Sequence, residues 1–229
     1  MRLALGQGPL LELGPMRLVI GNKNYSSWSM RPWIAAKAGG IPFEEEMIWL
    51  READTKERMR ALSPNAKVPA LIDGPVVAFE SISILEYLAE RAPSLWPDEA
   101  AARAYARSVC AEMHAGFAAL RNRCPMNIKR APASITLADD VKADVERIIL
   151  LLMTCRARFG GGGAFLFGRF TNADAMYAPI VSRFRAYDIP APGVVRAYMD
   201  AMMATPMWQE WQREALAETH AIGPIDSVS

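Results

Sequence analysis

Strand-like patterns occur only in the first 91 residues of this 229-residue chain, and this division constrains its fold more than any other feature. Short apolar or alternating runs predict strands, and apolar residues at helical spacing predict helices between and after them. The expected strands are 17–21, 43–50, 70–72 and 76–79, and the expected helices are 31–38, 55–62 and 81–91. This order predicts a small α/β domain.

From Asp98 onward the pattern is almost entirely helical. The expected helices are 100–121, 137–159, 172–187, 193–204 and 206–216. A proline-rich stretch, 93–97, predicts a linker. We therefore expect an α/β domain at 16–92 and an all-helical domain at 98–229. Residues 1–15 have neither a periodic pattern nor a signal-peptide layout, so we expect a disordered extension or a translation start assigned too early.

The charge balance gives no sign of a nucleic-acid or membrane partner. The chain has 26 Lys and Arg against 25 Asp and Glu, a formal net charge of +1, so no broad cationic surface is expected. No apolar run reaches the about 18 residues of a membrane helix. Because 52% of the residues are hydrophobic, the chain can bury a sizeable core. We expect a cytoplasmic protein.

The three cysteines are widely spaced and form no C-x-x-C pair, which argues against a disulfide framework, a zinc ribbon and a dithiol redox motif. Cys110 and His114 can share a helix face at i, i+4, but no third ligand is evident. We predict core packing for this pair and no metal site.

The segment NYSSWSMRPW, residues 24–33, joins the first predicted strand to the first predicted helix. A helix start leaves backbone N–H groups unpaired and carries a partial positive charge. A hydroxyl there can cap the helix, or it can donate to an anion such as a thiolate. One serine is enough for a cap, whereas this turn has Ser26, Ser27 and Ser29. Both interpretations are open for this turn taken alone.

The segment AKVPAL, residues 66–71, places a proline immediately before a predicted strand. Pro69 favours an extended Val68 and lacks a backbone donor of its own. A cis peptide bond would turn the N–H and C=O of Val68 towards an extended ligand backbone. An ordinary trans proline at a strand entry is the alternative, and X–Pro statistics favour it.

The segment FESISILEYL, residues 79–88, ends a predicted strand and opens a helix. Glu80 could hold an ammonium group, while the hydroxyl and N–H of Ser81 could hold a carboxylate. Plain helix capping explains both residues equally well. Together, the three loops offer a thiolate site, a backbone clamp and an amino-acid clamp, which is the outline of glutathione.

From Arg17 to about Leu216 the chain resembles the cytosolic glutathione transferases. The resemblance rests on YSSWSMRPW, SPNAKVPALID, FESISILEYLAE and FTNADAMYAPI. It implies a thioredoxin-like N-terminal domain, an all-helical C-terminal domain and a homodimer. The serine loop is most similar to that of the zeta-like and related bacterial branches, which reads Ser-Ser-Cys. Trp28 stands at the third position here, which counts against zeta-type isomerase chemistry.

The resemblance also implies roles for single residues. Ser26 stands where the family has its thiol-activating serine, and Ser27 is the alternative register. Tyr25 matches the catalytic tyrosine of other classes less well, because the paired serines follow it directly. Thr171 and Asp174 match the family's capping box, which is a folding element.

The remaining matches concern glutathione itself. Val68 would pair with its cysteinyl backbone, and Pro69 would be cis. Lys67 would lie next to the glycyl end, where the family often has glutamine. Glu80 and Ser81 would take the γ-glutamyl group.

These matches predict an enzyme of the detoxification type that transfers glutathione, its co-substrate, to small hydrophobic electrophiles without a metal. A glutathione-dependent isomerase of the maleylacetoacetate type, a reductive lyase and a non-catalytic glutathione-binding or regulatory protein are the alternatives. The electrophile is expected between the domains, against side chains for which core packing is the favoured alternative role: Tyr105, Met113, His114, Phe117 and Tyr177.

Overall fold

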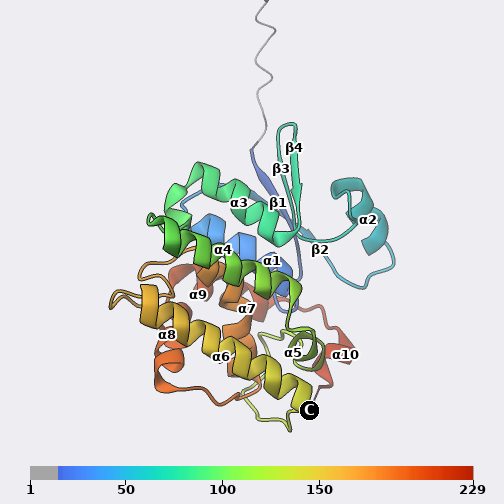
Figure 1. Cartoon of the computed structure of the whole chain (residues 1–229). Helices are drawn as coiled ribbons and strands as arrows, with labels where there is room; N and C mark the ends of the chain where they lie inside the picture. The colour runs from blue at the N-terminus through green and yellow to red at the C-terminus, as the bar shows by residue number, and fades with distance from the viewer. Residues whose placement is uncertain (1–14, 229) are drawn as a thin grey trace, which may run out of the picture.

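The computed structural model describes residues 15–228 (Figure 1). The expected extension, 1–15, lies outside the described residues except for Pro15. The first part of the chain forms strands β1 (Arg17–Gly21), β2 (Glu44–Ile48), β3 (Ala70–Asp73) and β4 (Val76–Phe79) with helices α1 (Ser27–Ala38), α2 (Thr55–Leu62) and α3 (Ser81–Arg91). The described residues beyond Arg91 contain no further named strand.

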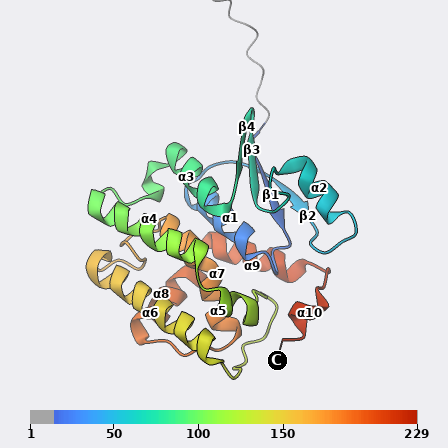
Figure 2. The same ribbon diagram turned by 45° about the vertical axis from the view of Figure 1, so that its right-hand side comes forward.

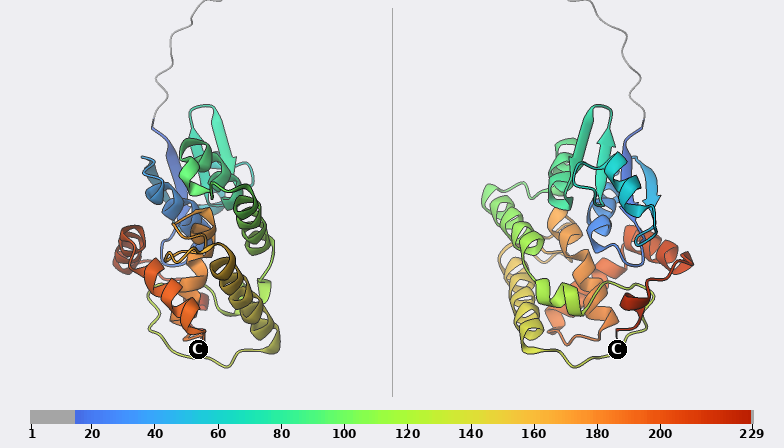
Figure 3. Two further views of the ribbon diagram at one scale, coloured as in Figure 1. Left: turned by 60° about the vertical axis from the view of Figure 1, so that its left-hand side comes forward. Right: turned by 90° about the vertical axis from the view of Figure 1, so that its right-hand side faces the viewer.

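The second part is a cluster of helices that begins after the short 3-10 turn η1 (Pro93–Leu95), which lies within the predicted linker. Figures 2 and 3 show the sheet at one end of the molecule and these helices at the other. They are α4 (Ala100–Ala115), α5 (Ala118–Arg123), α6 (Asp139–Phe159), α7 (Asn172–Ala186), α8 (Gly193–Met203), α9 (Pro206–Ala217) and α10 (Gly223–Asp226). The predicted fold class, a thioredoxin-like domain followed by a helical region, is confirmed.

The sheet has the strand order β2-β1-β3-β4. β1 runs parallel to β2 and antiparallel to β3, and β3 and β4 form an antiparallel hairpin. Because side chains alternate along a strand, Leu18 and Ile20 of β1 enter the main core, together with Trp33 of α1. Val19 points the other way and joins Met59 of α2 in a smaller apolar cluster. Helices therefore cover both faces of the sheet.

Two predicted helix boundaries were wrong. The helix expected at 100–121 is two helices, because Gly116 ends α4 and Phe117 takes a left-handed conformation with φ of 61°. α1 begins at Ser27 instead of Arg31, so that Pro32 lies inside the helix and not in its first turn. Proline disfavours interior helical positions, and the sequence pattern therefore placed the start of α1 too late.

α7 runs through the middle of the helical part, and only Arg185 among its residues is not buried. Its start carries the expected capping box, formed by Thr171 and Asp174. The buried Asp174 carboxylate accepts hydrogen bonds from the backbone N–H groups of Leu166, at 3.0 Å, and Thr171, at 2.8 Å. The Thr171 hydroxyl donates to it at 3.0 Å. This carboxylate thus fixes the loop that leads into the central helix.

Asp174→Ala is expected to lower the free energy of unfolding by about 2–4 kcal/mol, because it leaves several buried donors without an acceptor. Urea unfolding followed by circular dichroism measures the change. Asp139→Ala is the control, since the Asp139 side chain is 97% exposed, and it should shift the value by less than about 0.5 kcal/mol. Equal losses in the two variants would contradict the role assigned to Asp174.

The same carboxylate predicts a pH dependence of stability. Burial raises the pKa of Asp174 from 3.8 to about 6, so the folded state keeps a proton that the unfolded chain loses. This contribution is complete below about pH 4 and is lost as pH rises through about 6. The unfolding free energy of the wild type minus that of Asp174→Asn should therefore fall over this interval and level off above it. A constant difference would show that Asp174 does not titrate there.

Candidate functional site

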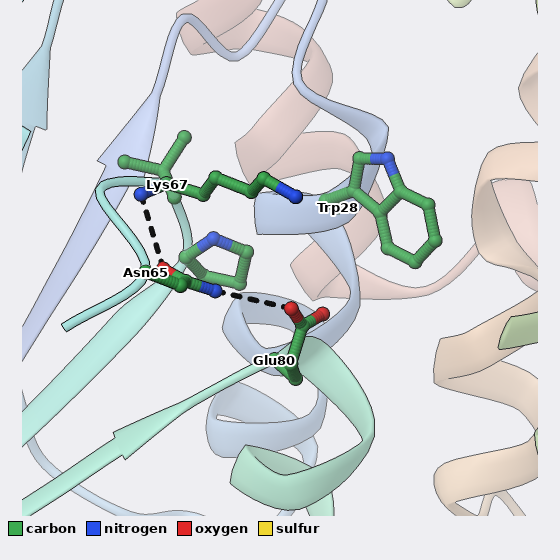
Figure 4. Close-up of a pocket in the computed structure, with 6 residues that line it drawn as sticks. Trp28, Asn65, Lys67 and Glu80 are labelled. Carbon is green, nitrogen blue, oxygen red and sulfur yellow. Dashed lines mark hydrogen bonds between the residues drawn. The ribbon is translucent and has the colours of Figure 1, made fainter. Parts of the chain in front are cut away.

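A cavity of about 370 Å³ lies where the loop before β3, the start of α3 and the first turn of α1 meet (Figure 4). Four of the predicted ligand-binding residues, Lys67, Val68, Pro69 and Glu80, line it together with Trp28 and Asn65. The two loops that supply the predicted backbone clamp and amino-acid clamp thus share one cavity.

The Val68–Pro69 peptide bond is cis, as the resemblance implied. Asn65, which the sequence analysis missed, connects the two loops of the cavity. Its side-chain oxygen accepts from the backbone N–H of Lys67 at 3.1 Å, and its amide donates to Glu80 Oε1 at 3.0 Å (Figure 4). The sequence did contain a signal for this role, because Asn65 is a small polar residue just before the loop that contains Pro69.

Glu80 is the N-cap residue of α3 and has a φ of 70°, a conformation that is uncommon for residues other than glycine. Its carboxylate lines the cavity and lies 3.7 Å from His114 Nε2. Ser81, the first residue of α3, is fully buried. Its hydroxyl accepts from Arg31 Nη1 at 3.4 Å. The Glu80 carboxylate therefore faces the first cavity, whereas the Ser81 hydroxyl faces a buried arginine.

The serines at the start of α1 do not cap it with their side chains. Ser26 is the N-cap residue but forms no side-chain capping bond. Its hydroxyl donates to Ser29 Oγ at 2.7 Å, and Ser29 Oγ accepts from the backbone N–H of Gly21 at 3.0 Å. The hydroxyl proton of Ser26 is thus used inside the protein. Helix capping, the simpler interpretation of this turn, does not account for it.

Ser27 has different surroundings. Its hydroxyl oxygen accepts a hydrogen bond from Arg183 Nη2 of α7 at 3.3 Å, and it donates to none of residues 15–228. Ser27 also lines a second cavity, of about 540 Å³. Of the two candidate registers, Ser27 is therefore the one that faces open space with a free hydroxyl proton.

The second cavity lies between the sheet domain and the helical part, and Trp28 lines both cavities. Its other lining residues are Tyr25, Ser27, Leu50, Arg51, Ala118, Arg121, Asn122, Pro125, Met126, Arg183, Ile222 and Ile225. The five side chains expected around an electrophile do not line it. Met113, Phe117 and Tyr177 belong to the core, the Tyr105 ring packs at a tilt against Phe159, and the His114 ring contacts Trp28. For Met113, Phe117 and Tyr177, core packing was the favoured alternative role.

Three arginines surround Trp28 and Ser27. The guanidinium carbons of Arg31 and Arg121 lie 4.2 and 5.0 Å from the centre of the Trp28 ring. Burial, and then the charges of its two arginine neighbours, lowers the pKa of Arg31 to about 9. Burial and Arg121 lower the pKa of Arg183 to about 10. Both remain cationic at neutral pH, so the site is strongly positive.

The sequence analysis missed these arginines, although a weak signal existed. Arg31 sits on the helix that carries the serine loop, and Arg183 interrupts the apolar pattern of MYAPIVSRF, residues 176–184. A charged residue inside an apolar helix pattern is unusual without a partner.

Tyr25 also lines the second cavity, but its hydroxyl is already engaged. It donates to the Asp226 carboxylate at 2.9 Å and accepts from the backbone N–H of Ile222 at 3.2 Å. Burial, with a contribution from Asp226, raises the pKa of Tyr25. A phenol held by a carboxylate is poorly suited to stabilise a second anion, so Tyr25 is the weaker candidate here as well.

Within residues 15–228 no group of three His, Cys, Asp or Glu side chains could hold a metal ion. Cys110 is buried in the core, and burial raises its pKa well above the usual value. None of the helices in the same part of the chain is both long enough and apolar enough to cross a membrane.

The family model for the glutathione S-transferase N-terminal domain matches residues 25–91, which include Ser26, Ser27 and all six residues that line the first cavity. A probable maleylacetoacetate isomerase of Caenorhabditis elegans is 34% identical over 100 residues, covering 42% of this chain and 46% of its own length. Glutathione S-transferase T1 of Arabidopsis thaliana is 28% identical over 161 residues, covering 67% and 66%.

Residues 25–91 of this chain are therefore similar to the N-terminal domain of the glutathione S-transferases. The chain matches only about half to two thirds of the length of these two relatives. Among solved structures, a glutathione transferase homolog from Burkholderia gl BGR1 with bound glutathione has a TM-score of 0.65 at 24% identity, and covers 89% of this chain and 100% of its own. At this identity the likeness shows the shared fold.

Proposed function

We propose that this protein is a glutathione transferase, which binds glutathione in the first cavity and transfers its thiolate to an electrophile in the second. The observation that carries the proposal is that Trp28 lines both cavities, while Ser27 at the start of α1 lines the second. Ligands in the two cavities would thus be neighbours across one side chain. Such proximity removes much of the entropic cost of a reaction between two molecules.

The first cavity offers groups that suit the ends of glutathione. The Glu80 carboxylate is placed for the γ-glutamyl ammonium group, and the Lys67 ammonium for the glycyl carboxylate. The backbone of Val68, beside the cis bond, is placed for the cysteinyl N–H and C=O. The N-terminus of the 11-residue helix α3, where Ser81 lies, favours the γ-glutamyl carboxylate.

Activation of the thiol requires a donor for the developing anion, because a free thiol has a pKa of about 8.5. We assign this role to Ser27, and keep Ser26 as the alternative. The geometry supports Ser27, since its proton is free and Arg183 donates to its oxygen. A hydroxyl that accepts a bond from a cation becomes a better donor itself. The positive start of α1 acts in the same direction.

The reaction follows from these placements. The thiol loses its proton to water, and the thiolate attacks the electrophilic carbon with its electron pair. A carbon–sulfur bond forms, and the leaving group departs with the electrons of the bond that breaks. Trp28 and the apolar wall of the second cavity reduce contact with bulk water.

A glutathione-dependent isomerase is the second candidate function. The similarity to a probable maleylacetoacetate isomerase favours it, and the same thiolate would add to and leave from the substrate. A turnover assay with an aromatic halide, run beside one with a maleyl-type acid, separates transfer from isomerisation. Absence of turnover with both would favour a non-catalytic binding protein.

A homodimer remains part of the proposal. Val76, Val77 and Phe79 of the edge strand β4 are among the exposed large hydrophobic side chains, at 37%, 44% and 37%. An exposed apolar edge strand favours association with another chain. A second copy covering this edge would leave both cavities accessible, because none of these three residues lines them.

Glu80→Gln is expected to weaken glutathione binding by about 1.5–3 kcal/mol, the usual worth of a hydrogen bond to a charged group. Glutamine keeps the size of the side chain and can still accept from Asn65. Glu90→Gln, at an exposed position on the same helix, is the control and should bind normally. Calorimetry gives both affinities. Equal affinities in a folded Glu80→Gln protein would remove Glu80 from the site.

Ser27→Ala is expected to raise the pKa of bound glutathione and to reduce turnover near neutral pH at least tenfold, about 1.4 kcal/mol in the barrier. The thiolate absorbance as a function of pH, and the rate with an aromatic halide, measure the two effects. Ser26→Ala is the matched variant, one residue away, and should change the thiol pKa much less.

The pair of variants decides the register. A pKa effect confined to Ser26→Ala would restore the family's usual assignment and overturn ours. If neither variant moves the thiol pKa, the activating group is neither serine, and Tyr25→Phe is the next variant to measure. Melting temperatures recorded for each protein separate loss of stability from loss of chemistry.

A further inference from the structure

The three arginines around Trp28 have more positive charge than their surroundings neutralise. Arg31 is 1% exposed and Arg183 is 3% exposed. Neither they nor Arg121 form an ion pair with any residue between 15 and 228. Their polar contacts are to neutral groups. Arg183 donates to the carbonyls of Cys124, at 2.9 Å, and Pro179, at 3.3 Å, besides Ser27.

Two acidic side chains near the second cavity, those of Asp144 and Asp226, are engaged elsewhere, and Glu80 faces the first cavity. Asp144 acts on Arg121 only at a distance, and its carboxylate accepts from the backbone N–H of Leu120 at 3.0 Å. Asp226 accepts from Tyr25 and from Asn127 Nδ2, both at 2.9 Å. None of the residues that line the second cavity is acidic.

Buried cations without a counter-ion are costly, because the loss of hydration is not repaid. The Trp28 ring offsets part of this cost through its contacts with the Arg31 and Arg121 guanidinium groups. Arg31 in addition leaves its Nε without a hydrogen-bond partner. A ligand with negative charge would supply what the protein itself does not.

The second cavity combines two kinds of wall. Arg51, Arg121 and Arg183 are its cationic part, and the last two lie on the side of Ser27 and Trp28. Most of the remaining wall is apolar, formed by Leu50, Pro125, Met126, Ile222 and Ile225. A purely hydrophobic electrophile would leave the guanidinium groups unpaired, whereas an inorganic anion would leave the apolar wall unused.

We propose that the electrophile of this enzyme is an organic acid, whose carboxylate binds Arg121 and Arg183 while its apolar skeleton lies against the rest of the second cavity. The inference rests on the proposed function, because it names the substrate class of that site. It replaces the small hydrophobic electrophile that the sequence led us to expect. The carboxylate bound to Arg183 would bring the acid next to Ser27, and hence next to the thiolate.

Two aromatic halides that differ only in charge test the proposal: 4-chloro-3-nitrobenzoate and 4-chloro-3-nitrobenzamide. With either, the thiolate forms a bond to the ring carbon that carries chlorine, and chloride leaves with the electron pair. Each rate is divided by the uncatalysed rate with glutathione, which removes the difference in intrinsic reactivity. We expect the wild type to favour the benzoate at least tenfold in kcat/KM.

Arg121→Gln should reduce that preference at least tenfold. Arg123→Gln is the matched control, since Arg123 lies on the same helix, is largely exposed and pairs with Asp140 at 3.1 Å. It should keep the preference of the wild type. A wild type without preference for the acid, or an equal loss of preference in the two variants, would overturn the proposal.

A binding measurement keeps this test independent of catalysis. Calorimetry with 3-nitrobenzoate and 3-nitrobenzamide, on protein saturated with S-methylglutathione, should show tighter binding of the acid, and Arg121→Gln should abolish the difference. If the acid binds only when the glutathione analogue is absent, the arginines serve a carboxylate of glutathione instead, and the proposal is wrong. If the protein binds 3-nitrobenzoate selectively but turns over neither halide, the carboxylate site is supported and the transfer reaction is refuted.

Discussion

Burial of two guanidinium groups without a carboxylate is the constraint around which the junction of the two halves is organised. Arg31 comes from α1 and Arg183 from α7, and these two helices are in contact. Desolvated charge must be met by polar groups. Here these groups are two backbone carbonyls, the face of Trp28 and the hydroxyls of Ser27 and Ser81. Because these hydroxyls stand at the starts of α1 and α3, Arg183 ties the start of α1 to α7, and Arg31 ties the start of α3 to α1.

Lys23, a second buried cation in the same domain, differs from the arginines because carboxylates neutralise its charge. Lys23, with a side chain that is 3% exposed, pairs with Glu45 at 2.6 Å and also with Glu214 of α9. Its ammonium group lies 4.9 Å from the Trp33 ring centre and 5.5 Å from that of Trp211. Such a paired and surrounded charge joins the domain to α9 and needs no ligand. The cation cluster at Trp28 has the aromatic contacts but lacks the carboxylates.

The sequence predicted the features that depend on local patterns. Strand and helix periodicity placed the elements of the sheet domain, and the short loop around Pro69 pointed to one side of a ligand cavity. The choice between Ser26 and Ser27 depends on the direction of each side chain, and adjacent residues on a helix point about 100° apart. No pattern encodes which of them meets Arg183, 156 residues away along the chain. The break at Phe117 was missed because Gly116 lies in a long helical pattern.

Trp28 links these observations, although in the sequence it only marked a departure from the Ser-Ser-Cys loop. Its ring supports Arg31 and Arg121 and meets the His114 ring at 5.3 Å. Cysteine offers no comparable aromatic face for a guanidinium group. Trp28 also lines both cavities. The tryptophan and the arginines therefore form one unit, in which the ring that lines both cavities also supports the charge of the second.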